Sequence, residues 1–270
     1  MDKRPIGVFD SGLGGLTAVR SLRKILPEED LIYFGDTSRV PYGGRSRETI
    51  LKYARQDVRF LRSFDLKAIL IACGTVSTTS LPVLRAENDL PVVGVVEPTC
   101  RRAAEITKNK RVGMIATQAS VRAGAYKKLL AELDPEIQVF TKACPLFVPL
   151  VENGRFRKGD AVIETVAREY LEPMRDTGID TLILGCTHYP LLTEIIADIM
   201  SPGVTLIDSG AAAARVLRQT LSDRGALAQR DHGTLTLYAS DRPEDFGALA
   251  GQFLRRPLES AVQHVDIERY

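Results

Sequence analysis

The sequence predicts an α/β protein made of two similar, pseudo-symmetric halves, each with a parallel β-sheet covered by helices. Short apolar runs alternate with amphipathic stretches, a pattern typical of parallel strands joined by crossover helices. The alternation restarts near residue 98, and the motifs that end two strands of the first half recur in the second. Hydrophobic residues make up 44% of the 270-residue chain and charged residues 26%, as in ordinary globular proteins. An active site is expected in the cleft between the two halves.

Four buried strands and two long helices are expected in the first half. Each strand is a short apolar run, and the strands cover residues 6–9, 31–34, 68–72 and 92–96. The first helix covers residues 15–26, with Leu16 and Val19 at helical spacing. It ends before Pro27, which cannot continue a helix. A second amphipathic helix covers residues 46–64.

The second half repeats this alternation. Its expected helices cover residues 98–108, 120–133, 159–176 and 190–199. Its expected strands cover residues 112–116, 137–140, 181–184 and 204–207. In both halves the first strand ends in small polar residues and the third strand ends in a cysteine followed closely by threonine.

Two domains follow from this repeat. The first is expected to comprise residues 1–97 together with 208–270, and the second residues 98–207. Cys73 then belongs to the first domain and Cys186 to the second. The last sixty residues carry no motif that indicates a function.

The charge balance and the chain's apolar runs argue against nucleic-acid and membrane partners. Lys and Arg number 36 and Asp and Glu 34, so the net charge of +2 leaves no basic footprint for nucleic acid. No apolar run approaches the roughly 18 residues of a membrane-spanning helix. Residues 1–5 lead straight into a strand, without the apolar segment of a signal peptide. A cytoplasmic protein is predicted.

The four cysteines, at positions 73, 100, 144 and 186, form no CxxC pair. A structural zinc site needs ligands paired at short spacing, so no metal is expected. Disulfides are unusual in a reducing compartment. Cys100 and Cys144 are predicted to be buried structural residues, as lone cysteines usually are.

Cys73 and Cys186 stand at the ends of two corresponding strands, where ligands bind in open α/β sheets. A turn and the start of a helix are expected next, so the helix dipole should lower the pKa of each thiol. Two thiols from opposite halves suit the inversion of a stereocentre, because a base on one face of a carbon removes a proton while an acid on the other face delivers one.

The glycine-rich run Gly12-Leu13-Gly14-Gly15 follows a strand and opens a helix, as a dinucleotide-binding loop would. It does not match G-x-G-x-x-G, because Thr17 stands where the last glycine belongs. No phosphate-binding P-loop sequence occurs either. Nucleotide binding is therefore not predicted.

Several motifs together resemble those of the glutamate racemase family, within the aspartate/glutamate racemase superfamily. The resemblance covers roughly residues 5–210 and rests on Asp10-Ser11-Gly12-Leu13-Gly14-Gly15, Asp36, Pro41-Tyr42-Gly43, Ala72-Cys73-Gly74-Thr75, residues 113–126, Val151-Glu152-Asn153-Gly154 and Gly185-Cys186-Thr187-His188-Tyr189-Pro190-Leu191-Leu192. The Asp-Ser-Gly opening and the Gly-Cys-Thr-His-Tyr-Pro block are highly specific.

By this resemblance, Cys73 and Cys186 are the two acid–base thiols. Asp10 lies beside Cys73, and His188, with Glu152 behind it, lies beside Cys186, each assisting proton transfer. Asp10 is also placed to cap helix 15–26.

The resemblance also implies a set of substrate-binding residues. They are Asp10, Ser11, Asp36, Pro41, Tyr42, Gly43, Gly74, Thr75, Thr117, Thr187 and His188. One position departs from the family. Gly74 stands where the family usually has an Asn, whose side chain contacts the substrate. We therefore expect Gly74→Asn to lower the Michaelis constant for glutamate without abolishing turnover.

The implied activity is an isomerase that interconverts L- and D-glutamate and supplies D-glutamate for peptidoglycan. The implied enzyme uses neither metal nor pyridoxal phosphate, takes a small-molecule substrate and forms a homodimer. Three alternatives stay open: a racemase for aspartate or another amino acid, a cysteine hydrolase that uses Cys186 and His188, and a two-lobed ligand-binding protein that needs neither thiol.

Overall fold

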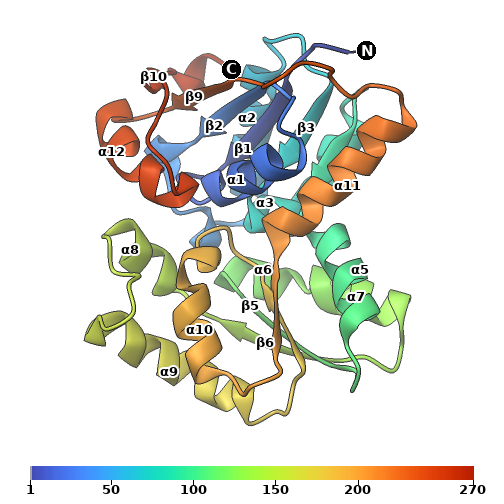
Figure 1. The fold of residues 1–270 in the computed structure, drawn as a ribbon, viewed down its shortest axis with the longest axis vertical. Coiled ribbons are helices and arrows are strands. Elements are labelled where there is room, and N and C mark those ends of the chain that lie inside the picture. Colours follow the sequence, from blue (N-terminus) through green and yellow to red (C-terminus); the bar gives the residue numbers. More distant parts are fainter. Residues whose placement is uncertain (1) are drawn as a thin grey trace.

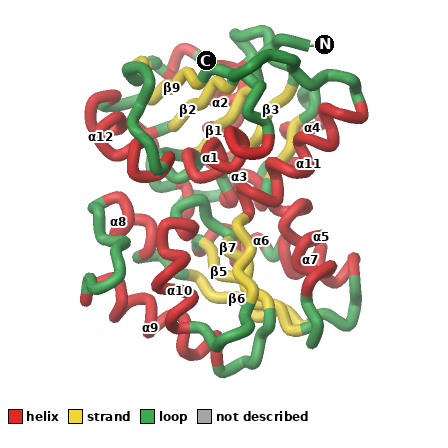
Figure 2. Tube along the Cα trace, in the orientation of Figure 1, coloured by secondary structure: helices red, strands yellow, loops and turns green. Residues whose placement is uncertain are grey.

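The computed structural model describes residues 2–270, which form two parallel sheets, one above the other, with helices around each (Figure 1). The upper sheet has six strands in the order β10-β9-β2-β1-β3-β4, and the lower sheet has four in the order β6-β5-β7-β8. Every strand pair is parallel. Figure 2 shows the strands as two separate groups. The predicted fold class is confirmed.

The strands are short and mostly buried. In the upper sheet they are β1 (Ile6–Asp10), β2 (Leu31–Gly35), β3 (Ala68–Ile71), β4 (Val92–Gly94), β9 (Leu235–Ala239) and β10 (Gln263–His264). In the lower sheet they are β5 (Arg111–Ala116), β6 (Gln138–Ala143), β7 (Thr181–Leu184) and β8 (Thr205–Asp208).

Twelve helices connect and cover these strands. They are α1 (Leu16–Ile25), α2 (Arg47–Leu61), α3 (Gly74–Thr79), α4 (Leu81–Ala86), α5 (Val96–Ile106), α6 (Gln118–Ala123), α7 (Ala125–Leu133), α8 (Phe147–Glu152), α9 (Ala161–Arg175), α10 (Thr193–Ile199), α11 (Ser209–Asp223) and α12 (Pro243–Leu254). Short 3₁₀ turns lie at Thr37–Arg39, Tyr42–Gly44, Tyr189–Leu192 and Ile267–Arg269.

Alternate residues of the upper strands face two different cores. Val8 and Tyr33 point toward the core shared with α1, α11 and α12. Phe9 and Phe34, their neighbours in sequence, point toward the core shared with α2 and α3. Since side chains alternate along a strand, a sheet covered on both faces needs apolar residues at every position. That requirement explains the unbroken apolar runs of these strands.

Two expected helices are interrupted. The one expected over residues 120–133 is two helices, because Gly124 adopts a left-handed backbone (φ +66°) that ends α6 and begins α7. The one expected over 190–199 begins as the 3₁₀ turn Tyr189–Leu192 and becomes helical only at Thr193. The helix start expected after Cys73 is the short helix α3. The short helices α4 and α8 carry too few turns to show a periodic pattern and were not expected.

The last sixty residues complete the upper half. Strand β9 pairs with β2 over five positions, from Leu31 with Leu235 to Gly35 with Ala239. Helix α11 leads from the lower half into the upper one and packs against α1 and α5 (Figure 1). The domain limits at residues 97 and 207 stay a prediction.

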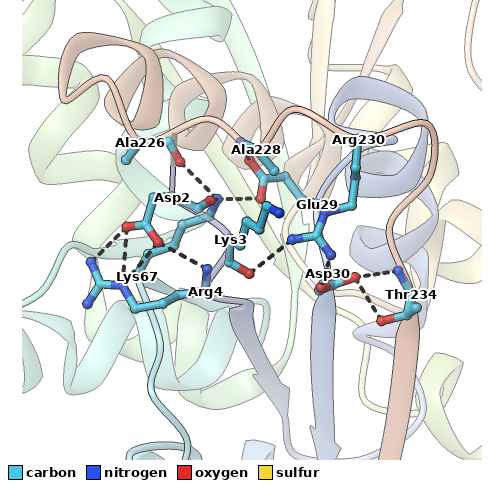
Figure 3. Close-up of polar contacts among 10 residues, drawn as sticks. All are labelled: Asp2, Lys3, Arg4, Glu29, Asp30, Lys67, Ala226, Ala228, Arg230 and Thr234. Carbon is cyan, nitrogen blue, oxygen red and sulfur yellow. Dashed lines mark hydrogen bonds and ion pairs between the residues drawn. The ribbon is translucent and has the colours of Figure 1, made fainter.

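A buried ion pair ties this C-terminal segment to the amino-terminal edge of the upper sheet (Figure 3). The Nζ atom of Lys67 lies 2.5 Å from Oε2 of Glu29, and both side chains are almost fully buried. Lys67 also donates to the backbone carbonyls of Asp2 and Ala226, at 2.9 and 2.8 Å. Glu29 accepts a hydrogen bond from the backbone N–H of Ala228 at 2.9 Å. The pair therefore joins the starts of β2 and β3 to the segment before β9.

No helix of residues 2–270 has the length and apolar character needed to cross a membrane. The longest helices, α2, α9 and α11, have 15 residues each. A spanning helix needs roughly 20 mostly apolar residues. These three helices instead bury one face and expose the other.

We predict that Lys67→Met lowers the free energy of unfolding by about 3–5 kcal/mol, because it leaves Glu29 buried without a cation. Lys67→Met combined with Glu29→Leu should recover most of the loss, since apolar residues then replace both charges. Urea denaturation at neutral pH measures both effects. Lys158→Met removes the exposed pair with Asp198 and serves as the control, with a much smaller expected effect. A single Lys67 variant as stable as the control would contradict this prediction.

Candidate active site

A cavity of about 320 Å³ lies between the two halves, where the carboxyl ends of the central strands of both sheets meet. Its walls come from the segments that follow β1, β2, β3, β5, β6 and β7. The lining residues are Asp10, Ser11, Val40, Pro41, Tyr42, Gly43, Gly44, Cys73, Gly74, Thr75, Thr117, Gln118, Cys144, Pro145, Val148, Pro149, Glu152, Gly185, Cys186, Thr187 and His188. All the site residues expected from the sequence are among them, except Asp36.

Cys73 lies at the N-cap of α3, directly beyond the end of β3. Its Sγ is 3.7 Å from Oγ of Ser11, and the residue is buried. Burial, together with the nearby carboxylate of Asp10, raises the pKa of the Cys73 thiol to about 12. The expected lowering of this pKa is therefore wrong: α3 is six residues long, and desolvation of the thiolate outweighs hydrogen bonds from the helix start and from Ser11.

Asp10 holds the glycine-rich loop rather than capping α1 directly. Its Oδ2 accepts hydrogen bonds from the backbone N–H groups of Gly12 and Gly15, at 3.2 and 3.0 Å. Its Oδ1 accepts from the Thr187 hydroxyl, in the other half, at 3.4 Å. The Asp10 side chain is fully buried, which raises the pKa of its carboxyl group, although the charge of His188 opposes this shift.

Cys186, His188 and Glu152 form a chain of polar contacts on the opposite wall. The Sγ of Cys186 is 3.8 Å from Nδ1 of His188, whose Nε2 is 3.0 Å from Oε1 of Glu152. Burial of the imidazole disfavours its charge, but the hydrogen bonds to Cys186 and Glu152 outweigh burial and raise the pKa of His188 to about 10. Near neutral pH, His188 is therefore an imidazolium, which places a positive charge beside the Cys186 sulfur.

The two halves touch beside the cavity. The hydroxyls of Thr75 and Thr117, from opposite halves, are 3.0 Å apart. The Thr17 hydroxyl donates to the backbone carbonyl of Thr187 at 2.8 Å. These contacts hold the turn after Cys186 and the start of α6 against the upper half.

Gly74 packs directly on the backbone of the lower half. A Cβ atom at this position would lie 2.4 Å from the carbonyl oxygen of Gly185, a separation that real Cβ atoms do not adopt. An Asn side chain therefore has no room here unless the halves separate. This contact argues against the expectation that Gly74→Asn tightens substrate binding.

Asp36 lies behind the cavity wall. Its carboxylate accepts hydrogen bonds from Arg39 at 2.6 Å, from Ser240 at 2.8 Å and from the hydroxyl of Tyr42. The Tyr42 hydroxyl also donates to the carboxylate of Asp57. Tyr42 therefore lines the cavity, but its hydroxyl points away from the cavity toward Asp36 and Asp57. Asp36 thus supports the wall that Tyr42 forms, and the structure does not bring its carboxylate to the cavity.

Sequence reasoning missed several lining residues, half of them on α8 or just before it. Val148 and Pro149 lie on this helix, which was not expected, and form an apolar wall. Cys144 also lines the cavity, although the sequence suggested only a structural role. Cys144 comes directly after β6, which ends at Ala143. The expected strand ended at residue 140, so the sequence pattern did not place Cys144 at the end of a strand. Cys100 lies away from the cavity, buried in α5.

Among residues 2–270, no group of three or more His, Cys, Asp or Glu side chains is arranged to hold a metal ion. The polar side chains that line the cavity carry thiols, hydroxyls, two carboxyl groups, one imidazole and the amide of Gln118. This set can transfer protons and donate hydrogen bonds to carboxylates.

Comparison with known proteins gives consistent matches over nearly the whole chain. A family model for Asp/Glu/Hydantoin racemases matches residues 16–217. The chain is 43% identical to the glutamate racemase of Geobacter metallireducens over 97% of both chains. It is 41% identical to that of Latilactobacillus sakei, over 100% of this chain and 97% of the other.

Solved structures are similar as well. A glutamate racemase isoform from Bacillus anthracis has a TM-score of 0.94 at 36% identity, covering 98% of both chains. The glutamate racemase of Francisella tularensis, solved with D-glutamate, has a TM-score of 0.91 at 38% identity and covers both chains completely.

We predict that Gly74→Asn lowers the free energy of unfolding by about 1–3 kcal/mol, the usual cost of overpacking. It should also increase the radius of gyration measured by small-angle scattering, because the halves must separate. Gly44→Asn is the matched control: Gly44 also lines the cavity, but a Cβ there meets nothing within 4 Å. A Gly74→Asn protein with the stability and the radius of gyration of the wild type would contradict this prediction, because the Gly185 backbone would then move aside at no measurable cost.

We predict a pH-dependent stability difference between the wild type and His188→Gln. The folded-state pKa of His188, about 10, lies above its ordinary value of 6.5, so the stabilisation is complete below about pH 6.5. It is lost as the pH rises toward and through 10. Urea unfolding of both proteins across this range measures the difference. The exposed His232→Gln is the control, and a difference that stays constant with pH would contradict the prediction.

Proposed function

We propose that this chain, which belongs to the Asp/Glu/Hydantoin racemase family, interconverts L- and D-glutamate without a bound cofactor. The observation that carries the proposal is that two thiols, Cys73 and Cys186, reach one enclosed cavity from opposite halves. Relatives named glutamate racemase, 43% identical over nearly the full length, support glutamate as the substrate.

Racemisation needs proton transfer on both faces of the substrate's α-carbon. One thiolate accepts the α-proton while the C–H electron pair is left on the α-carbon and delocalises into the adjacent carboxylate. The opposite thiol then donates its proton to the other face, and the S–H electron pair stays on that sulfur. By family resemblance, Cys186 takes the proton from L-glutamate and Cys73 takes it from D-glutamate.

The two thiols have different charged neighbours. Cys73, with a pKa of about 12, holds its proton at neutral pH and is ready to act as an acid. The Cys186 sulfur instead lies 3.8 Å from Nδ1 of the His188 imidazolium. Glu152 holds the imidazolium in place from behind.

The same surroundings support recognition of an amino dicarboxylate. The hydroxyls of Ser11, Thr75 and Thr117 line the cavity and can donate to carboxylate oxygens. Val148 and Pro149 offer an apolar wall to the methylene groups of the side chain. The enclosed setting excludes water and strengthens these interactions as charge develops on the α-carbon.

A cysteine hydrolase is the second candidate. The Cys186–His188–Glu152 chain has the order of a nucleophile, a base and an orienting carboxylate. A hydrolase would use this wall alone and would have no role for Cys73. The two candidates therefore differ in what Cys73 does.

The proposal extends to the cellular setting that family resemblance implies. We place the enzyme in the cytoplasm as a homodimer, where it supplies D-glutamate for peptidoglycan. Relatives named glutamate racemase support the activity on which this setting depends.

The direct test follows the circular dichroism of L-glutamate incubated with the pure protein, with no cofactor added. The signal should decay to zero as the two enantiomers become equal, and a chelator should not slow the decay. An absolute need for pyridoxal phosphate or for a metal would overturn the proposal.

We predict that Cys73→Ala and Cys186→Ala each reduce racemisation in both directions by about 10²–10⁴-fold, the usual contribution of a positioned acid or base. In D₂O, Cys73→Ala should still exchange the α-proton of L-glutamate slowly, and Cys186→Ala that of D-glutamate. Cys100→Ala is the matched control, since Cys100 lies outside the cavity. A nearly harmless Cys73→Ala together with an inactive Cys186→Ala would favour the hydrolase.

A further inference from the structure

The two polar contacts of the His188 imidazole are not enough to fix its orientation. The torsion that turns a histidine ring about its Cβ–Cγ bond has broad, roughly two-fold preferences, so it does not hold the ring by itself. One of the two contacts is long, since Sγ of Cys186 lies 3.8 Å from Nδ1. Half a turn of the ring would put carbon atoms where the nitrogens are and would break the contacts to both Cys186 and Glu152. Packing must therefore hold the ring in its plane.

One packing contact comes from α12, in the C-terminal segment that carries no sequence motif. The ring of Phe253 stands edge to face with the imidazole of His188, with 5.7 Å between the ring centres and 89° between the ring planes. Two aromatic rings prefer this arrangement to a face-to-face one. Phe253 is buried and does not line the cavity. It therefore reaches the imidazole from behind the cavity wall and does not meet a ligand there.

Helix α12 gives Phe253 a fixed base. It packs against α1 and β9 of the upper half (Figure 1). Ala250 and Leu254, on the same helix, are buried with Phe253 in the core beneath it. Near the other end of the helix, Phe246 packs on Tyr33 of β2, with 6.2 Å between the ring centres. A ring carried by this helix is therefore held in place by the upper half.

The glycine-rich run Gly12-Leu13-Gly14-Gly15 supplies a second surface. A Cβ atom at Gly14 would lie 2.6 Å from Cε1 of His188, so only glycine lets the backbone come this close to the imidazole. A Cβ atom at Gly12 would lie 3.7 Å from Oε1 of Glu152. The run therefore lies against both members of the His188–Glu152 pair, which gives this motif a role that does not involve a nucleotide.

The glycine-rich run is itself held from two sides. The Asp10 carboxylate accepts hydrogen bonds from the backbone N–H groups of Gly12 and Gly15. The Tyr33 hydroxyl donates to the backbone carbonyl of Gly12 at 2.6 Å. Because both bonds are buried, the backbone at Gly14 has little freedom to follow a movement of the imidazole.

We propose that Phe253 is a positioning residue which, together with the backbone of Gly14, holds the His188 imidazole with Nδ1 toward Cys186 and Nε2 toward Glu152. Neither Phe253 nor Gly14 lines the cavity, so each acts on the reaction only through His188. Both belong to the upper half, whereas His188 belongs to the lower half. The imidazole is therefore held in this orientation only where the two halves meet. The effect on turnover rests on the proposed racemase function, but the effect on the imidazole does not.

The test is an NMR titration of the side chains in protein that contains isotope-labelled histidine. The chain has three histidines, and the exposed His232 and His264 serve as references within each sample. The ring nitrogens of His188 report its charge and its hydrogen bonds. Titratable groups around it are Cys186 and Glu152, which bond to it, and Asp10, which interacts with its charge.

Phe253→Leu should move the pKa of His188 from about 10 toward its ordinary value of 6.5. The smaller side chain lets the imidazole turn, so it loses the hydrogen bonds that outweigh burial in the wild type. We expect a change of about one pH unit or more, which is tenfold in the ratio of charged to neutral imidazole. Gly14→Ala, which places a methyl group where the ring lies, should change the pKa in the same direction.

Turnover gives a second measurement. Phe253→Leu should lower kcat for both enantiomers of glutamate by about tenfold and leave KM nearly unchanged, because a misplaced imidazole weakens interactions made in the transition state. Phe60→Leu is the matched control. Phe60 is equally buried, but it packs on Phe34 in the core on the other face of the upper sheet. Phe60→Leu should keep the wild-type kcat and the wild-type pKa of His188.

Three results would each overturn the proposal: an unchanged His188 titration in Phe253→Leu, an equal change in Phe60→Leu, or a loss that appears in KM alone. Far-ultraviolet circular dichroism checks that the variants fold. Phe253→Met keeps a long, adaptable apolar side chain without a flat ring, so it takes the place of a Leu variant that does not fold. If the wild type does not racemise glutamate, the titration still shows whether Phe253 holds the imidazole, so the two failures are distinct.

Discussion

The contact between Gly74 and Gly185 is the constraint on which the rest of the cleft depends. Gly74 follows Cys73 in the chain, and Gly185 precedes Cys186, so this backbone contact fixes how far apart the two thiols are anchored. A Cβ at Gly14 would likewise lie 2.2 Å from the Thr187 hydroxyl. Glycine at these positions lets the two sheets bring their carboxyl ends together, and the enclosed cavity follows from that approach.

Close approach also creates the electrostatic difference between the two walls. On one wall, burial beside Asp10 raises the pKa of Cys73, because a thiolate there would face both desolvation and a carboxylate. On the other wall, His188 is equally buried but bonds to both Cys186 and Glu152, which keeps it protonated. Similar strand ends thus give the two thiols neighbours of opposite charge, a carboxylate beside Cys73 and an imidazolium beside Cys186. The difference comes from their neighbours and not from their places in the fold.

Much of this organisation could be predicted from the sequence, because apolar runs and the cysteines at their ends are local signals. The strand ends at Cys73 and Cys186 predicted the cleft and its position. The pKa of Cys73 could not be predicted, because it depends on how deeply the folded chain buries the thiol and on the carboxylate of Asp10 nearby. Asp36 follows β2 directly, as a site residue would, yet its carboxylate turns to Arg39 and Ser240. The room at Gly74 likewise depends on a carbonyl more than a hundred residues away.

The electrostatic difference between the walls has a limit set by the proposed reaction itself. Enantiomers have equal free energies in water, so the equilibrium constant is unity and kcat/KM must be the same in both directions at every pH. The resting state, with Cys73 protonated and the His188 imidazolium beside Cys186, therefore cannot favour either direction in kcat/KM. The resting state can only change how the free-energy barrier, measured from free enzyme and substrate, is divided between substrate binding and turnover. If kcat is larger in one direction, KM must therefore be larger in that direction by the same ratio. Any substitution at His188 or Glu152 must change kcat/KM by one common factor in both directions.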